Sequence, residues 1–115
     1  MSILSQTETP DGIVLLTIDR PERRNALSGN ALAALHRAFD AIAARPELRA
    51  VVLTGAGVSF CSGADMKSGP EDMDALEGSA MGELLGRVKG PLTRNFVMQE
   101  LMAGLFEKIH RLRQP

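Results

Sequence analysis

The alternation of apolar and polar residues predicts a strand–strand–helix–strand unit in the first half of the chain. Residues 13–18 (IVLLTI) and 50–54 (AVVLT) are short, apolar and rich in β-branched side chains, a pattern typical of buried strands. Residues 3–9 form a further candidate strand. The Pro-Asp-Gly turn after it is short enough to predict antiparallel pairing with residues 13–18. We therefore expect one sheet, with residues 50–54 in its interior.

A helix is predicted between the second and third strands. It begins after Ser28, a favourable N-cap residue, and continues to about Ala44, because Pro46 cannot extend it. Its apolar side chains recur at helical spacing, at Leu32, Leu35, Phe39 and Ile42. We expect this face of the helix to pack on the sheet.

The second half of the chain has a less regular pattern. Residues 68–90 contain five glycines and show weak periodicity, so we expect this variable loop to be the least ordered segment. A second helix is predicted at about residues 93–113. Its apolar face consists of Met98, Leu101, Met102, Leu105, Ile109 and Leu112. The elements together predict an α/β fold in one domain, residues 1–115. Because residues 50–54 need neighbours on both sides, we expect this domain to be the front part of a larger fold.

Composition narrows the class of protein. A chain of 115 residues can form one domain, and its net charge of −1, from 13 basic and 14 acidic residues, argues against a nucleic-acid partner. No apolar run approaches the length needed to span a membrane, and the N-terminus lacks the features of a signal peptide. The single cysteine excludes an internal disulfide framework. These features predict a soluble, cytoplasmic protein.

The strand at residues 50–54 ends in a corner of small residues. Gly55-Ala56-Gly57 follows it directly, and Ser62-Gly63-Ala64-Asp65 comes shortly after. Small side chains allow a ligand to approach the main chain, so a site here would act through backbone N–H groups. The corner lacks the lysine and spacing of a P-loop, and Phe60 stands where a dinucleotide-binding motif needs its third glycine. A plain tight turn is the alternative interpretation.

The reactive side chains do not form a recognisable catalytic group. Cys61 lies in an apolar run and is expected to be a buried, inert thiol. Neither Ser59 nor Ser62 occupies the nucleophile position of a hydrolase motif. His36 and His110 have charged neighbours and are expected at the surface, and no set of residues has metal-ligand spacing.

Two clusters of charge flank the corner in the sequence. An acidic cluster lies in the variable loop, at Glu71, Asp72, Asp74 and Glu77. A basic cluster precedes the first helix, at Arg20, Arg23 and Arg24. We expect solvated loops in both places. For the basic cluster, contact with an anion is an alternative, because the glycine corner lies close.

Three segments resemble the enoyl-CoA hydratase/isomerase (crotonase) family. They are residues 19–27 (DRPERRNAL), 51–55 (VVLTG) and 60–67 (FCSGADMK). The resemblance covers residues 11–67 well and continues more loosely to the end of the chain. It implies a fold of repeated ββα units, incomplete in this chain, and a parent that assembles as a homotrimer or hexamer.

The resemblance also implies a function. The substrates would be acyl-CoA thioesters, as in fatty acid metabolism, with no metal and no cofactor apart from the coenzyme A of the substrate. The reaction would hydrate or isomerise a double bond next to the thioester, with hydratase as the default lyase activity. A dehalogenase, a hydrolase or a ring-closing synthase stays open.

The same resemblance assigns roles to residues of the corner. The backbone N–H of Ala64 would be one donor of an oxyanion hole, which stabilises negative charge on the thioester oxygen without a reactive side chain. Arg24 would meet a phosphate of CoA. The residues that would line the substrate are Arg24, Ala26, Ser62, Ala64, Asp65 and Met66.

Other parts of the family's site are not found in this sequence. The second oxyanion donor and the catalytic carboxylates would follow Pro115, and Glu71, Glu77 and Glu83 of the variable loop are not candidates to replace them. We therefore expect the 115-residue chain alone to be inactive. The alternative to a catalytic parent is a non-catalytic remnant or subunit that keeps the fold, with or without affinity for CoA.

Overall fold

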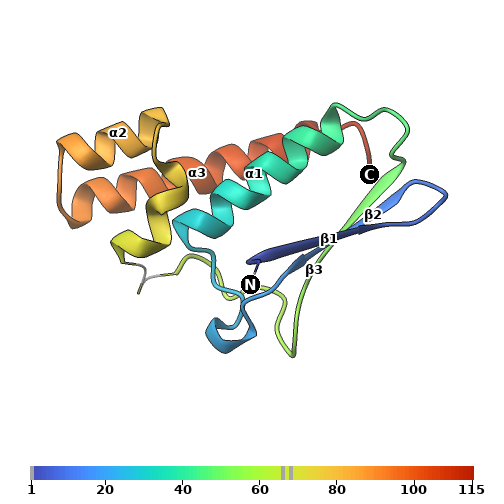
Figure 1. The fold of residues 1–115 in the computed structure, drawn as a ribbon, viewed down its shortest axis with the longest axis horizontal. Coiled ribbons are helices and arrows are strands. Elements are labelled where there is room, and N and C mark those ends of the chain that lie inside the picture. The colour runs from blue at the N-terminus through green and yellow to red at the C-terminus, as the bar shows by residue number, and fades with distance from the viewer. Residues whose placement is uncertain (1, 66, 68) are drawn as a thin grey trace.

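The computed structural model describes residues 2–65, 67 and 69–115. It contains a small sheet covered on one face by helices (Figure 1). In chain order the elements are β1 (Leu4–Glu8), β2 (Ile13–Ile18), the 3₁₀ helix η1 (Pro21–Arg23), α1 (Gly29–Ala43), β3 (Ala50–Gly55), the 3₁₀ helix η2 (Pro70–Leu76), α2 (Ala80–Arg87) and α3 (Pro91–Arg111).

The sheet has the order β1-β2-β3. β1 runs antiparallel to β2, which confirms the hairpin expected from the short turn. β3 runs parallel to β2, with Leu15 opposite Val52 and Ile18 opposite Gly55. Because parallel strands end at the same edge, the loops that follow β2 and β3 lie side by side there (Figure 1).

The two faces of the sheet differ in burial. Val14, Leu16 and Ile18 of β2 are buried on the face toward the helices. On the other face Leu15 is 39% exposed and its neighbour Val52 is 50% exposed. The expectation that residues 50–54 lie in the interior is therefore wrong for this chain. In the described structure β3 is the last strand of the sheet, and no element covers its outer face.

Helix α1 lies over the inner face of the sheet (Figure 1). Ser28 caps it as expected, because its side-chain oxygen accepts a hydrogen bond from the Ala31 N–H at 3.1 Å. The four side chains of the predicted apolar face are all buried in the core: Leu32, Leu35, Phe39 and Ile42. Apolar spacing alone was sufficient to predict this contact.

The segment after the corner is more regular than its sequence predicts. It forms η2 and α2, where an irregular variable loop was expected. Met73 and Leu76 are buried, and they attach η2 to α1. The acidic cluster is also not wholly solvated, because the Asp74 carboxylate accepts a hydrogen bond from the Asn30 side chain at 2.7 Å. Whether the segment is the least ordered part of the chain stays a prediction.

Helix α3 packs alongside α1 (Figure 1). The contact includes His36, whose Nε2 lies 2.8 Å from the Leu101 carbonyl oxygen and whose Nδ1 lies 2.9 Å from Lys108 Nζ. The expected surface position of His36 is therefore wrong, since it is half-buried and both of its ring nitrogens contact residues of α3. His110 is exposed, as expected.

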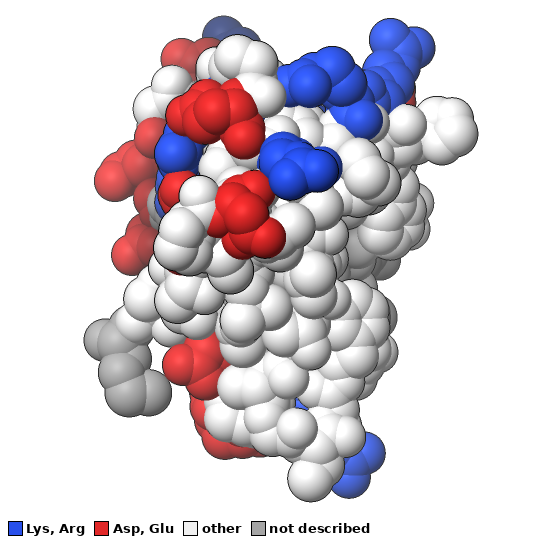
Figure 2. Space-filling model, turned by 90° about the vertical axis from the view of Figure 1, so that its right-hand side faces the viewer, with Lys and Arg blue, Asp and Glu red and all other residues white. Residues whose placement is uncertain are grey.

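The face drawn in Figure 2 carries charges of both signs. Most of them gather in its upper part, a broad area without Lys, Arg, Asp or Glu lies below, and a few more charges of both signs lie at its lower edge. This mixture agrees with the near-neutral net charge of the sequence. Within the described residues, no helix combines the length and the apolar character required for a membrane span.

Candidate functional site

Two loops at one edge of the sheet form the candidate site, residues 20–27 after β2 and residues 56–65 after β3. Asn25 joins them. Its side-chain oxygen accepts a hydrogen bond from the Arg20 N–H at 2.8 Å, and its Nδ2 donates to the carbonyls of Ala56 at 2.8 Å and Ser59 at 2.7 Å. Asn25 and its neighbour Arg24 both have left-handed backbones, with φ of 57° and 52°. Such angles are unfavourable outside glycine, and the three hydrogen bonds of the buried Asn25 side chain offset that cost.

Glycines are required at the end of β3 and within the second loop, for different reasons. A Cβ at Gly55 would collide with the Phe60 carbonyl oxygen and lie 2.6 Å from Asn25 Nδ2. At Gly63 the space is open, but φ is +102°, an angle that L side chains rarely adopt. Cys61 is half-buried rather than buried, and its Sγ lies 3.4 Å from the Gly63 N–H. The end of β3 at Gly55 is thus closely packed, whereas Gly63 is needed for its backbone angle.

Ala64 is held against the first loop by its neighbours. Leu27 and Ala64 form an isolated parallel bridge, in which the Leu27 N–H donates to the Gly63 carbonyl at 2.8 Å and the Asp65 N–H donates to the Leu27 carbonyl at 2.9 Å. In this pattern the N–H of Ala64 points away from Leu27. Ala64 is exposed, and its N–H has no hydrogen-bond partner among the described residues. Within residues 62–65, the described structure thus leaves the Ala64 N–H as the backbone donor without a partner.

A buried carboxylate follows this donor directly. The Asp65 side chain is 4% exposed and contacts both Arg20 at 3.1 Å and Arg23 at 2.7 Å. It also accepts from the Lys67 N–H at 3.0 Å, while Arg20 Nη1 donates to the Ala26 carbonyl at 2.6 Å. Arg20 and Arg23 are thus ion-paired rather than solvated, which corrects the sequence-based expectation. Burial raises the pKa of Asp65, but the Lys67 N–H and the two guanidinium groups outweigh it and hold the pKa below its usual value.

The other residues expected to line the substrate occupy different environments. The Arg24 side chain is exposed, and its carbonyl accepts from the Ser62 N–H at 3.1 Å, so the structure brings these two together. Ala26 is buried. Met66 lies outside the described residues. The contact of these residues with a substrate stays a prediction. Among the described residues no cluster of His, Cys, Asp and Glu is suited to hold a metal ion.

A pocket of about 460 Å³ opens beside Ala64. Its apolar wall is formed by Met73 of η2 and by Met98 and Met102 of α3. Its remaining lining residues are Ala64, Asp65, Pro91, Arg94, Asn95 and Gln99. Sequence reasoning missed this pocket, because only the tertiary fold brings the start of α3 to the corner. The spacing of Met98 and Met102, one helical turn apart, was the available signal.

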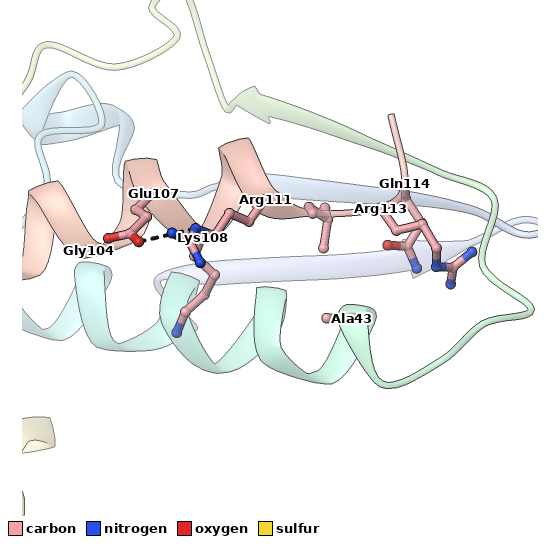
Figure 3. Close-up of a pocket in the computed structure, with 8 residues that line it drawn as sticks. Ala43, Gly104, Glu107, Lys108, Arg111, Arg113 and Gln114 are labelled. Atoms are coloured by element: carbon pink, nitrogen blue, oxygen red, sulfur yellow. Dashed lines mark ion pairs between the residues drawn. The ribbon is translucent and has the colours of Figure 1, made fainter.

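A second hollow of about 500 Å³ lies between the C-terminal ends of α1 and α3 (Figure 3). Glu107, Lys108 and Arg111 are already paired, Arg111 with Glu107 at 3.2 Å and Lys108 with Asp40 at 2.9 Å. The Gln114 amide donates to the Ile42 carbonyl at 3.0 Å and thereby ties the end of the chain to α1. We assign no ligand to this hollow, since it is built from contacts between the two helices.

Known proteins resemble this chain in sequence and in fold. Residues 8–107 match the model of a family described as enoyl-CoA hydratase/isomerase. The chain is 45% identical over 74 residues to a probable enoyl-CoA hydratase of Rhodobacter capsulatus, covering 61% of this chain and 26% of that protein. It is 33% identical over 106 residues to enoyl-CoA hydratase EchA19 of Mycobacterium tuberculosis, covering 71% of this chain and 40% of that protein.

A solved enoyl-CoA hydratase of Mycobacterium smegmatis superposes on the whole chain with a TM-score of 0.79 at 30% identity, over 38% of that structure. The chain thus spans between about a quarter and two fifths of these relatives. The resemblance of the three sequence segments and the expected α/β fold are both confirmed. The chain belongs to the enoyl-CoA hydratase/isomerase family.

Proposed function

We propose that this chain forms the thioester-binding part of an enzyme that hydrates or isomerises a carbon–carbon double bond next to a CoA thioester. The observation that carries the proposal is the unpartnered Ala64 N–H beside the pocket of about 460 Å³. Family membership supports it, because the relatives named above are enoyl-CoA hydratases.

The chemistry explains why a backbone donor is useful here. In hydration, water gives up a proton to a base as its oxygen bonds to the β-carbon, the π pair of the double bond shifts toward the α-carbon and the carbonyl π pair moves onto the thioester oxygen. The α-carbon then takes up a proton, and the carbonyl forms again. In isomerisation, loss of a proton from the substrate places charge on the same oxygen. A donor that already points at this oxygen stabilises both intermediates without reorganisation.

The surroundings of Ala64 fit the two ends of such a substrate. The acyl group would enter the pocket, where the thioether side chains of Met73, Met98 and Met102 can adapt to its shape. The exposed guanidinium of Arg24 would bind a CoA phosphate, for which its planar set of donors is well suited. A trimeric or hexameric parent, a cytoplasmic location and the absence of a prosthetic group belong to the proposal as well.

The described residues of the pocket include no carboxylate that is free to act as acid or base. Asp65 supplies the one carboxylate among the described pocket residues, and both of its oxygens are bound by arginines. We therefore propose that the second oxyanion donor and the proton-transferring groups come from outside this sequence. The chain alone would bind the thioester and would not turn it over.

Amide NMR of the chain during titration with acetoacetyl-CoA tests the binding role. The Ala64 amide proton should move downfield, and its shift should saturate together with those of Arg24 and Met98. Free CoA is the control, since it lacks the thioester oxygen and should leave Ala64 nearly unmoved. Saturable shifts at Arg24 and Met98 with an unchanged Ala64 amide would contradict the proposal.

A further inference from the structure

We propose that Asp65, together with Arg20 and Arg23, is a positioning group that fixes the direction of the Ala64 N–H. The inference rests on the proposed function of that N–H as a donor to the thioester oxygen. Asp65 is a positioning residue in this view, and it does not touch the substrate.

The direction of this N–H is determined by a single peptide plane. The Ala64 N–H and the Gly63 carbonyl belong to the same trans peptide group, so they point in opposite directions. The Gly63 carbonyl accepts a hydrogen bond from the Leu27 N–H at 2.8 Å. Whatever holds Leu27 opposite Gly63 therefore also aims the Ala64 donor.

Local backbone preferences are insufficient to hold this plane. Gly63 has φ of +102°, with nothing within 4 Å of the position a Cβ would take. Glycine is the residue with the widest choice of backbone angles, and no neighbour at the Cβ position of Gly63 restricts that choice. The peptide plane needs a constraint from outside the loop.

The arginine pair supplies that constraint across the bridge. One nitrogen of Arg20 donates to the carbonyl of Ala26, the residue before Leu27, at 2.6 Å. Its other terminal nitrogen donates to the carboxylate of Asp65, the residue after Ala64, at 3.1 Å. One rigid guanidinium group thus spans both segments of the bridge. Arg23 binds both oxygens of the same carboxylate, at 2.7 and 3.0 Å, and prevents its rotation.

Stability alone does not account for charges buried at this position. Removing a carboxylate and a guanidinium from water is costly, and a well-packed apolar replacement is often as stable or more stable. The Arg20 and Asp65 side chains are 9% and 4% exposed. In the ion pairs among the described residues that do not involve Asp65, both side chains are at least 28% exposed. The buried charges therefore occur at the one place where the proposed chemistry needs a fixed backbone direction.

The test compares three variants of the chain by amide NMR. Asp65→Asn keeps the shape and removes the charge, and Arg23→Gln is a milder change at a side chain that is 36% exposed. Arg45→Gln is the matched control, because it removes the surface pairs of Arg45 with Glu8 and Glu47. Melting temperature is followed for each, so that loss of folding is recognised.

At saturating acetoacetyl-CoA, we expect the downfield shift of the Ala64 amide in Asp65→Asn and Arg23→Gln to be less than about half of the wild-type shift. The reason is that a hydrogen bond weakens when its donor is misaligned. Without ligand, the Leu27 amide should exchange about tenfold faster, while Val97 keeps its protection. Arg45→Gln should change neither quantity. A uniform fall in protection across the chain would instead indicate a merely structural role and would overturn the inference.

The outcomes separate the inference from the proposed function. A full Ala64 response in the folded Asp65→Asn and Arg23→Gln variants overturns the positioning role alone. A wild-type chain that binds acetoacetyl-CoA without any response at Ala64 overturns the proposed function, and the positioning role with it. If Asp65→Asn does not fold, Arg23→Gln decides the matter by the same two readouts.

Discussion

Replacing Ala64 by proline removes the proposed backbone donor and leaves every hydrogen bond of the described structure in place. Because the Ala64 N–H has no partner among the described residues, its deletion breaks no internal hydrogen bond. In a complex with the acetoacetyl-CoA enolate it would lose one hydrogen bond to a charged oxygen, worth about 1.5–3 kcal/mol. Since 1.4 kcal/mol corresponds to a factor of ten, we expect binding to weaken about 10- to 150-fold.

The control for this change is Ala64→Val, which adds bulk at the same position and keeps the N–H. Isothermal titration calorimetry with acetoacetyl-CoA measures the affinity of both variants, and melting temperature reports folding. The second measurement is needed because a proline also restricts Gly63, whose φ is +102°. A folded Ala64→Pro chain that binds as tightly as Ala64→Val would refute the backbone-donor role. The corner would then be only a tight turn.

Four further results are expected. Because the pKa of Asp65 is lowered in the folded state, its contribution to stability is complete above the ordinary aspartate pKa of about 3.9 and is lost as pH falls below it, so chemical denaturation from pH 6 to pH 3 should show a smaller loss for Asp65→Asn than for the wild type. Phe39→Ala should lower the free energy of unfolding by about 3–5 kcal/mol in urea titrations, since Phe39 is buried in the core, and a change below 1 kcal/mol would contradict its assigned packing. The purified 115-residue chain should not hydrate short enoyl-CoA substrates above the buffer rate, and clear turnover would show that an acid or base has been overlooked. In hydrogen exchange without ligand, residues 69–90 should be less protected than β3, and equal protection would contradict their expected mobility.

The sequence predicted best those elements that a local pattern defines. The spacing from Leu32 to Ile42 predicted helix α1 and its buried face, and Ser28 marked its first turn. A three-residue turn signal predicted the β1–β2 hairpin. In each case the signal lies within one short stretch of the chain, so the local sequence contains the information.

Contacts between distant segments could not be predicted in the same way. The sequence around Arg20 and Arg23 does not indicate whether their side chains are solvated or ion-paired. Their partner Asp65 lies more than 40 positions further along the chain. His36 similarly owes its partial burial to α3. The strand at residues 50–54 has the composition of a buried strand, yet its exposure depends on neighbours rather than on its own side chains. Glycines obscured η2 and α2, and the position of η2 depends on two buried anchors, Met73 and Leu76.

In the candidate site, too, local motifs were predictable and tertiary contacts were not. Ala64, Ser62 and Arg24 were identified from motifs, and the structure places all three in one corner. The pocket of methionines and the buried ion pairs emerged only from the fold. Asp65 illustrates the difference, since the motif predicted contact with substrate and the structure shows its carboxylate engaged by arginines.

A crystal structure of the chain with acetoacetyl-CoA tests the central claim most directly. The measured quantity is the distance between the Ala64 nitrogen and the thioester oxygen. We expect about 2.7–3.1 Å, the range of an oxyanion donor, with the acyl group among Met73, Met98 and Met102. An ordered ligand whose thioester oxygen lies beyond hydrogen-bond reach of Ala64 would contradict the account.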